Sequence, residues 1–508
     1  MSIDLLPEEP RLDIRSAGAR LARAELGPAG HLIVILPRNP ARSLWRSLPE
    51  GAQLARALRD APDAAAVPAV STRLRTSART AVDIATLPSG DSAFERLTFA
   101  RKLVSHAIAT GARSVSVVMP ALTPAQRRAL AEAVAAAALA ALAPAPSLKR
   151  APASAPRLRT LYLHEAGADL PLERWRAEAV GNGLARWLGA LPSNELTMGS
   201  YRARIEALAR NVGWRMQFLD EAALVKRNAG AFLAVAQGNA TRDAGIAHLR
   251  YRPKGAAARP RLALVGKGIC FDTGGTNLKS ARGMQYMHED MLGSAVALGV
   301  LLALTRLRVP WSIDCWLAIT ENRLSPSAYK PHDVVTASNG TTIEVIHTDA
   351  EGRMALADAL ALATREEPGI VIDYATLTGA CVNAVTERYS GAFTNRAELE
   401  PVIVRAGRAS GERVWPFPFD ADFDEALDSP VADVRQCVID NEGDHILAAR
   451  FLSRFVSGEA PWIHIDLASA RKKGGLAHVP TDITGFGVRY TLALLLDEGL
   501  VPDGAPAR

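Results

Sequence analysis

The sequence between residues 261 and 470 alternates apolar β-like runs with apolar helical runs, and this alternation restricts the fold more than any other feature. The β-like runs are nearly continuous in aliphatic residues, as in strands that are buried on both faces. Helical runs between strands place helices on the faces of the sheet. The pattern therefore predicts an α/β fold with a mixed, mostly parallel central sheet flanked by helices. The β-like runs are 261–271, 309–320, 341–348, 369–379 and 461–470, and the helical runs are 291–307 and 352–367.

A chain of 508 residues is too long for one simple core, so two domains are expected. Apolar runs at 31–37 and 115–120 predict short strands, and Thr123 with Pro124 predicts the start of a helix that continues to residue 143. A proline- and alanine-rich stretch at 143–159 predicts an exposed loop, and 157–166 predicts one more strand of the same unit. We predict a small N-terminal α/β domain over residues 1–172 and a larger C-terminal domain over residues 173–508.

Charge and cysteine content exclude several classes of protein. Residues 1–172 hold 22 Lys and Arg against 14 Asp and Glu, so the N-terminal domain is basic. This surplus fits either a DNA-binding surface or a solvated basic face.

Four separated cysteines without a CxxC pair argue against a disulfide scaffold and favour a reducing compartment. Because the N-terminus lacks the apolar core of a signal peptide and no uncharged stretch reaches ~20 residues, we expect a cytoplasmic protein with no membrane segment.

Acidic residues lie where the predicted strands end. Asp272 closes the run 261–271, Asp290 precedes the helical run at 291, and Asp349 and Glu351 follow the run 341–348. Loops at strand ends of such sheets converge on a ligand site. In an extended segment Asp349 and Glu351 point to the same side. Four converging carboxylates repel unless a cation neutralises them, and hard divalent metals take carboxylate oxygens.

Two lysines accompany these acids. Lys267 is embedded in an apolar run, where a nearby metal would let it act as a neutral amine ligand. The alternative is an ion pair with Asp272 or Asp290. Lys279 follows a glycine-containing loop that can turn back toward Asp272 and present a charged amine to substrate. A single aspartate at a strand end, taken alone, is more often a turn former or a helix cap.

The segments VGKGICFDTGGTNLK, MHEDMLGSA, HTDAEGRMALADAL and ATLTGAC together resemble the catalytic domain of the leucine aminopeptidase (leucyl or cytosol aminopeptidase) family. The resemblance runs from about residue 191 to residue 489, and TDAEGR is its most specific motif. The N-terminal domain matches only in its α/β character. The resemblance implies that residues 173–508 are a catalytic peptidase domain.

The resemblance also implies two divalent metal ions, zinc or manganese, and a metal-bridged water that attacks the scissile carbonyl. Lys267, Asp272, Asp290 and Glu351 would hold the more loosely bound ion. Asp272, Asp349 and Glu351 would hold the tighter one. The free α-amine of the substrate would bind a metal, so that one residue is removed from a peptide N-terminus.

Further roles follow from the same resemblance. Lys279 would polarise the scissile carbonyl and stabilise the oxyanion. Arg353 would hold a bicarbonate ion as general base; the alternative is an arginine that pairs with Asp349 or Glu351. The predicted substrate-binding residues are Met287, Thr376, Leu377, Gly379 and Ala468.

Several positions depart from the pattern of the family, including Asp444 and His445, which stand where smaller residues are common and alter the neighbouring surface. Three more departures lie closer to the predicted site. His347 stands where asparagine is common, as a packed ring or a hydrogen-bond donor behind the site. Ser280 replaces a typical proline and loosens the loop after Lys279. Arg471 falls near an apolar position of the substrate pocket, where it would shift specificity toward acidic or polar residues.

The resulting hypothesis is a cytoplasmic dimetal aminopeptidase with a leucine-type preference that acts on peptides as a homohexamer. Two alternatives stay open. One is a DNA-binding or regulatory protein that acts through its basic N-terminal domain. The other is a dipeptidase of the cysteinylglycine-cleaving type, which differs in substrate preference.

Overall fold

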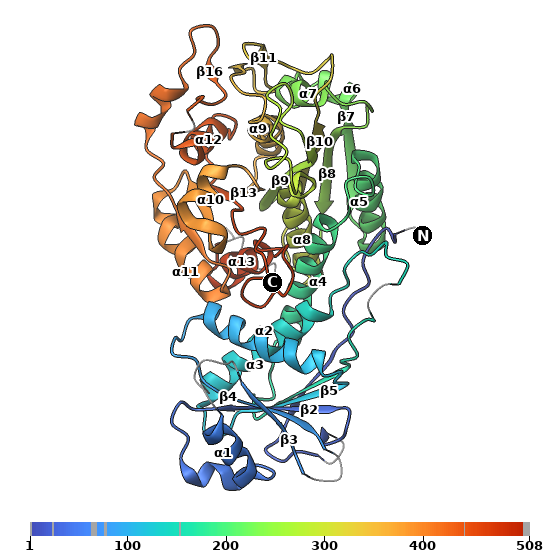
Figure 1. Cartoon of the computed structure of the whole chain (residues 1–508). Coiled ribbons are helices and arrows are strands. Elements are labelled where there is room, and N and C mark those ends of the chain that lie inside the picture. The colour runs from blue at the N-terminus through green and yellow to red at the C-terminus, as the bar shows by residue number, and fades with distance from the viewer. Residues whose placement is uncertain are drawn as a thin grey trace.

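The computed structural model describes residues 3–22, 25–61, 69–75, 79–151, 154–440 and 442–500. Two units, each built on its own sheet, are stacked end to end, and the smaller N-terminal one lies at the bottom in Figure 1. The predicted class, a two-domain α/β fold with a mixed central sheet, is confirmed. The boundary between residues 172 and 173 stays a prediction, and the outer limits of the two ranges, residues 1 and 508, lie outside the described residues.

The N-terminal domain contains a six-stranded sheet in the order β1-β6-β5-β2-β4-β3. All neighbours are parallel except the edge strand β3, which runs antiparallel to β4. The predicted strands at 31–37, 115–120 and 157–166 correspond to β2, β5 and β6. The strands are β1 (Asp13–Ala17), β2 (Gly30–Leu36), β3 (Val70–Arg73), β4 (Ala81–Thr86), β5 (Ser114–Val118) and β6 (Thr160–His164).

Helices cover this sheet, and α2 (Ala93–Ala109) and α3 (Pro124–Leu142) lie between it and the larger domain (Figure 1). Helix α1 (Gly51–Asp60) lies on the far side. The predicted start of α3 is confirmed, because the Thr123 hydroxyl accepts a hydrogen bond from the Gln126 N–H and Pro124 is the first helical residue.

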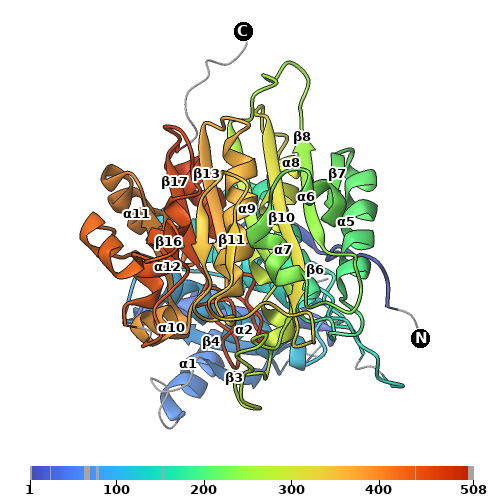
Figure 2. The same cartoon turned by 90° about the horizontal axis from the view of Figure 1, so that it is seen from above.

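The C-terminal domain contains an eight-stranded sheet in the order β15-β14-β17-β13-β9-β10-β8-β7. Its centre, β17-β13-β9-β10, is parallel, and antiparallel pairs join β14 to β17 and β8 to its two neighbours. Figure 2 shows these strands side by side. The strands are β7 (Arg215–Asp220), β8 (Gly245–Tyr251), β9 (Leu262–Asp272), β10 (Ile313–Asn322), β13 (Ile370–Ala375), β14 (Ser390–Thr394), β15 (Val414–Pro416) and β17 (Trp462–Asp466).

Helices cover both faces of this sheet. Gly266 of β9 lies against α8 (Leu292–Arg306), because a Cβ on it would come within 2.4 Å of the Ser294 Cα. The next residue, Lys267, lies against Gly352 of α9 (Glu351–Thr364). Because consecutive strand residues point to opposite faces, α8 and α9 lie on opposite sides. The remaining helices are α4 (Leu172–Gly189), α5 (Met198–Val212), α6 (Glu221–Val225), α7 (Gly230–Ala236), α10 (Gly379–Val385), α11 (Glu400–Ser410), α12 (Asp444–Ser453) and α13 (Val488–Leu492).

Helix α8 is apolar because it is a core helix. The segment Met287–Arg306 has the length and hydropathy of a membrane span, but 89% of its apolar window is buried inside the protein. It packs against the sheet on one side and against α4 on the other, where Gly181 and Gly299 bring the two helices together: a Cβ on Gly181 would come within 2.4 Å of the Gly299 carbonyl oxygen.

The prediction that residues 341–348 form a strand of the central sheet is wrong. Only β12 (Thr342–Glu344) is a strand there, and it pairs with β11 (Val334–Thr336) and β16 (Val434–Arg435) in a separate three-stranded sheet. After β12 the chain continues as a loop that leads to α9.

A buried cation links the two domains. Arg489 of α13 pairs with Glu132 of α3 and with Glu178 of α4, and its Nε donates to the Ser410 carbonyl at 2.8 Å. Beside it, the buried carboxylate of Glu412 accepts hydrogen bonds from the backbone N–H groups of residues 487 and 490, each at 2.8 Å. The last helices of the chain thus hold the N-terminal domain against the C-terminal one.

Candidate active site

The site begins where β9 ends. Asp272 is the last residue of β9, and the chain then turns through Gly274 (φ 88°) and Gly275 (φ 66°). This region of φ favours glycine, and a Cβ on Gly274 would come within 2.4 Å of the Asn277 carbonyl oxygen. The turn brings Lys279 back, so that its Nζ lies 2.8 Å from Asp272 Oδ2, as the sequence predicted for this loop.

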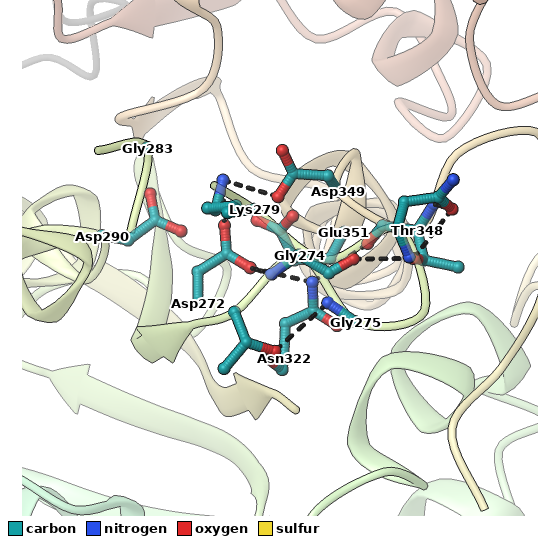
Figure 3. A network of polar contacts seen from close by, with 12 residues as sticks. Asp272, Gly274, Gly275, Lys279, Gly283, Asp290, Asn322, Thr348, Asp349 and Glu351 are labelled. Atoms are coloured by element: carbon teal, nitrogen blue, oxygen red, sulfur yellow. Dashed lines mark hydrogen bonds and ion pairs between the residues drawn. The ribbon is translucent and has the colours of Figure 1, made fainter. Parts of the chain in front are cut away.

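Carboxylates from three separate segments meet at this strand end (Figure 3). Asp290 follows a 3-10 turn, Met287–Glu289, and Glu351 is the first residue of α9. One oxygen atom each of Asp272, Asp290 and Glu351 lies within 4.8 Å of the others, and all three side chains are buried. The expectation that Asp349 and Glu351 share an extended segment is wrong, because a helix begins at Glu351; its positive N-terminal end favours that carboxylate.

Two lysine ammonium groups lie among these carboxylates. Lys267 Nζ is 2.9 Å from Asp290 Oδ1 and 3.0 Å from Glu351 Oε1, and Lys279 Nζ is 2.5 Å from Asp349 Oδ1. Burial alone would lower the pKa of each lysine, but the carboxylates outweigh it and raise both pKa values. Two alternatives were open for Lys267, a neutral metal ligand or an ion pair. The structure shows Lys267 paired with both Asp290 and Glu351, so it must lose a proton before it can bind a metal ion.

The charges of this cluster do not balance. Four carboxylates face two ammonium groups, and burial together with repulsion from Glu351 and Asp272 raises the pKa of Asp349 to about 7. Asp290 Oδ2 and Glu351 Oε2 are buried and, within the described part of the chain, make no hydrogen bond. Buried carboxylate oxygens with a deficit of positive charge are what a divalent cation requires. The residues present therefore fit a metal centre.

Polar residues that the sequence analysis missed hold the cluster in place. Asn322, at the end of β10, donates to Asp272 Oδ1 at 2.8 Å and to the Thr348 carbonyl at 3.0 Å. The hydroxyl of Tyr329 donates to the same carbonyl at 2.8 Å, and Thr348 Oγ1 donates to the Gly274 carbonyl at 2.7 Å. The sequence signal that could have identified Asn322 is its place at the end of β10, the strand next to β9. These bonds connect the turn after β9 to the loop before α9.

A cavity of about 500 Å³ opens beside the cluster. All five residues predicted to bind substrate line it, together with Lys267, Lys279 and the four carboxylates. The buried carboxylate of Asp466 positions one wall, because it accepts from the Leu377 N–H at 3.1 Å and from the Thr378 hydroxyl at 2.7 Å. The Thr376 hydroxyl donates to Asp290 Oδ1 at 2.8 Å, and both residues line the cavity, so a substrate bound there would lie beside the cluster.

Arg353 is not among the residues that line this cavity. Its side chain is buried, with Nη2 2.7 Å from Asp444 Oδ1 and Nη1 donating to the Gln436 carbonyl at 3.2 Å. The predicted alternative partners, Asp349 and Glu351, make no ion pair with it among the described residues. Asp444 comes from the first turn of α12, 91 residues further along the chain.

Arg471 does line the cavity, but its charge is engaged. The guanidinium pairs with Glu289 and Asp482, and it stacks over the Tyr286 ring at 3.7 Å from the centroid. Burial raises the pKa of Glu289 to about 7, and the Arg471 cation opposes that rise. Arg471 therefore pairs with two carboxyl groups, of which Glu289 lines the cavity and Asp482 lies behind it.

The other two departures have local roles. His347 Nδ1 accepts from the Asp349 N–H at 3.3 Å, so the ring supports the loop before α9. Burial and the nearby Lys279 lower the pKa of His347, which favours this neutral, accepting state. The Ser280 hydroxyl accepts from the Gly283 N–H at 3.1 Å and begins a turn.

Comparisons with known proteins agree with this geometry. The family described as "Cytosol aminopeptidase family, catalytic domain" matches residues 183–492. A probable cytosol aminopeptidase of Syntrophotalea carbinolica is 43% identical over 65% of this chain and 66% of its own length. One of Gloeobacter violaceus is 40% identical over 63% of each chain. The matches therefore span just under two thirds of these relatives. A mutant of tomato leucine aminopeptidase has a TM-score of 0.82 at 27% identity and covers 97% of this chain and 98% of its own.

Proposed function

Because this chain belongs to the cytosol aminopeptidase family, we propose that it is a metallo-aminopeptidase that hydrolyses the N-terminal residue from peptides. One observation carries the proposal: three buried carboxylates, the partly exposed Asp349 and two lysines form a cluster that opens on a cavity of about 500 Å³. A cluster of this kind holds divalent cations, and the cavity next to it has room for the first residue of a peptide.

The proposed ligands are those of the sequence analysis. Lys267, Asp272, Asp290 and Glu351 hold one ion, and Asp349 joins Asp272 and Glu351 at the other. When bound, two zinc or manganese ions would supply Lewis-acid chemistry and lower the pKa of a water nucleophile. The support for this arrangement is the proximity of the Asp272, Asp290 and Glu351 oxygens and the two buried oxygens without a hydrogen bond.

The residues of the chain divide the remaining work. Lys279 faces the cavity as a cation, so it can donate to the scissile carbonyl oxygen and stabilise the charge that develops there. Thr376 and Leu377 are the proposed source of backbone hydrogen bonds to the peptide. The Leu377 N–H already donates to Asp466 and the Thr376 carbonyl accepts from Lys267, so the Thr376 N–H and the Leu377 carbonyl are the groups that can serve.

The resemblance assigns the general base to a bicarbonate ion held by Arg353, a residue that does not itself line the cavity. The Asp444 carboxylate already occupies Arg353 Nη2. We therefore expect bicarbonate to compete with Asp444 for the guanidinium. A rate that depends on bicarbonate more strongly in Asp444→Ala than in the wild type would support this assignment.

A leucine-type preference is the proposed specificity. Met287 and Ala468 give the cavity apolar walls, and Arg471 does not demand an acidic side chain because Glu289 and Asp482 neutralise it. Glu289→Gln leaves Arg471 with one carboxylate fewer. It should raise the rate with aspartyl substrates relative to leucyl ones, whereas an unchanged ratio would show that Arg471 does not reach the first side chain.

The direct test is hydrolysis of aminoacyl-naphthylamides and dipeptides, cysteinylglycine included, with and without added manganese. Asp349→Asn and Glu351→Gln should lose activity by orders of magnitude while they stay folded, and Asp428→Asn, at an exposed aspartate, is the matched control. Full turnover in either cluster variant would refute the site. A rate with cysteinylglycine far above that with leucyl peptides would favour the dipeptidase alternative.

Three coarser expectations accompany the proposal. The homohexamer predicted from the resemblance can be measured by light scattering. A cytoplasmic location agrees with the names of the relatives. DNA binding stays a prediction; three of the basic residues behind it, Arg101, Arg127 and Arg128, make contacts within the chain. Failure to retard duplex DNA at low salt would remove it.

A further inference from the structure

A second cluster of possible metal ligands lies in the N-terminal domain. His31 comes from β2, Asp83 from β4 and His106 from the last turn of α2. One ligand atom of each lies within 4.8 Å of the others. His31 Nε2 is 2.9 Å and His106 Nδ1 is 2.8 Å from the same oxygen, Oδ2 of Asp83. His31 and Asp83 are almost completely buried, whereas the His106 side chain is 48% exposed.

Hydrogen bonds around His31 fix which of its nitrogens carries the proton. The Thr110 hydroxyl donates its hydrogen to the Ala107 carbonyl at 2.7 Å, so its oxygen must accept from His31 Nδ1 at 3.1 Å. A neutral His31 is then protonated at Nδ1 and presents the lone pair of Nε2. This Nε2 is buried, and the group that it faces is Asp83 Oδ2 at 2.9 Å. With the proton on Nδ1, the Nε2 lone pair and the Asp83 carboxylate oxygen face the same point and can share one cation there.

We propose that His31, Asp83 and His106 bind one divalent transition-metal ion of the zinc class. Two imidazoles and a carboxylate are a ligand set that suits zinc and its neighbours and disfavours magnesium and calcium. Tetrahedral zinc with bonds of 2.0–2.1 Å separates its ligand atoms by ~3.3 Å. The two histidine nitrogens, 2.9 and 2.8 Å from Asp83 Oδ2, need to move away from that oxygen by only about 0.4–0.5 Å to reach this separation. The exposed side of His106 gives the ion a path from solvent and leaves a position for water.

The groups behind the ligands are arranged as in metal sites. The remaining nitrogen of a metal-bound histidine usually donates to an oxygen, and the other carboxylate oxygen is hydrogen-bonded. Here His31 Nδ1 donates to Thr110, and Asp83 Oδ1 accepts from the Ser71 hydroxyl at 2.7 Å. These contacts hold both buried ligands in the orientation that binding needs. The bound ion would connect two strands of the N-terminal sheet to α2.

The competing explanation is a doubly protonated His31 that forms an ion pair with Asp83. Both explanations place a positive charge at the same point, but only the proposal requires a metal. This site is built from residues that the proposed aminopeptidase centre does not use, so either assignment can fail without the other.

The test compares metal content in three full-length proteins: wild type, His106→Ala and His332→Ala. His106 is half exposed, so its loss should not unfold the chain, and His332, 82% exposed, is the matched control. Each protein is stripped with a chelator, equilibrated with zinc, desalted and analysed by mass spectrometry. We expect His106→Ala to hold one zinc ion fewer per chain than the wild type and His332→Ala to hold the same number. Equal zinc content in wild type and His106→Ala would overturn the proposal and favour the imidazolium.

A crystallographic measurement supplements the analysis of metal content. Diffraction data collected on both sides of the zinc absorption edge should show an anomalous peak among the three side chains in the wild type and none in His106→Ala. Because the catalytic centre is present in both proteins, its own peaks serve as the internal reference. A peak that appears only at a zinc concentration far above that of the protein would mark an adventitious ion and overturn the assignment.

Discussion

Replacement of the buried Glu412 by glutamine should remove a pH dependence of stability. Burial is the main cause that raises the pKa of this carboxyl from 4.5 to about 7, and the N–H groups of Tyr490 and Gly487 reduce the rise. The unfolded chain releases this proton near pH 4.5, but the folded protein keeps it until about pH 7. The stability that the protonated group contributes is therefore complete below pH 4.5 and is lost as the pH rises through 7. At about 1.4 kcal/mol for each pH unit, the loss amounts to about 3 kcal/mol.

Denaturant unfolding followed by tryptophan fluorescence at pH 4.5 and pH 8 measures this effect. The free energy of unfolding of Glu412→Gln, minus that of the wild type, should increase by about 3 kcal/mol between the two pH values. Other titrating groups cancel in this difference. Glu398→Gln, at an exposed glutamate, should show a difference that does not change with pH. If the Glu412→Gln difference is also constant, the carboxyl is ionised throughout and the argument from burial is wrong.

Three further variants test other parts of the structure. Lys279→Met should lower kcat by about 10²–10³-fold with little change in KM, because it removes the proposed donor to the oxyanion. Lys330→Met, at an exposed lysine, should leave kcat unchanged, and steady-state kinetics at equal metal content compares the two variants. Asp444→Ala should make the rate several-fold more sensitive to added bicarbonate, as rate measurements in bicarbonate-free buffer would show, and an insensitive variant would argue against that anion. Gly181→Ala should lower the free energy of unfolding by about 1–3 kcal/mol, because the added Cβ clashes with α8. Gly183→Ala, whose Cβ meets only ordinary contacts, should raise it by about 0.5–1 kcal/mol. Equal shifts of the denaturant midpoint in the two variants would contradict the close packing at Gly181.

Local patterns were sufficient where a local cause determines the structure. Thr123 and Pro124 predicted the start of α3 because a cap and a first-turn proline act within one helical turn. The same reasoning failed at 341–348. The apolar run there satisfies a strand pattern, but which sheet it joins depends on β11 and β16, and β16 lies about 90 residues later.

The candidate site shows the same division. The acids at strand ends were found from the sequence because a buried charge is conspicuous in an apolar run. Asn322 was not, since an asparagine at a strand end is ordinary until it is seen to donate to Asp272, 50 residues away. The partner of Arg353 was missed for the same reason, because Asp444 belongs to a helix that folds over the site from a distant part of the chain.

The buried Arg489 belongs to a set of contacts between the two domains that form late in synthesis. Its partner Glu132 is 357 residues earlier in the chain, so the N-terminal domain leaves the ribosome long before the guanidinium that anchors it exists. One hydrophobic cluster of that domain, around β2 and β4, contains N-terminal residues alone. The other cluster also includes Leu476, Val479 and Phe486, so it is completed only when these late residues have been made. Docking then becomes a late event, and a ribosome that stops before residue 489 releases a chain whose two halves lack this link.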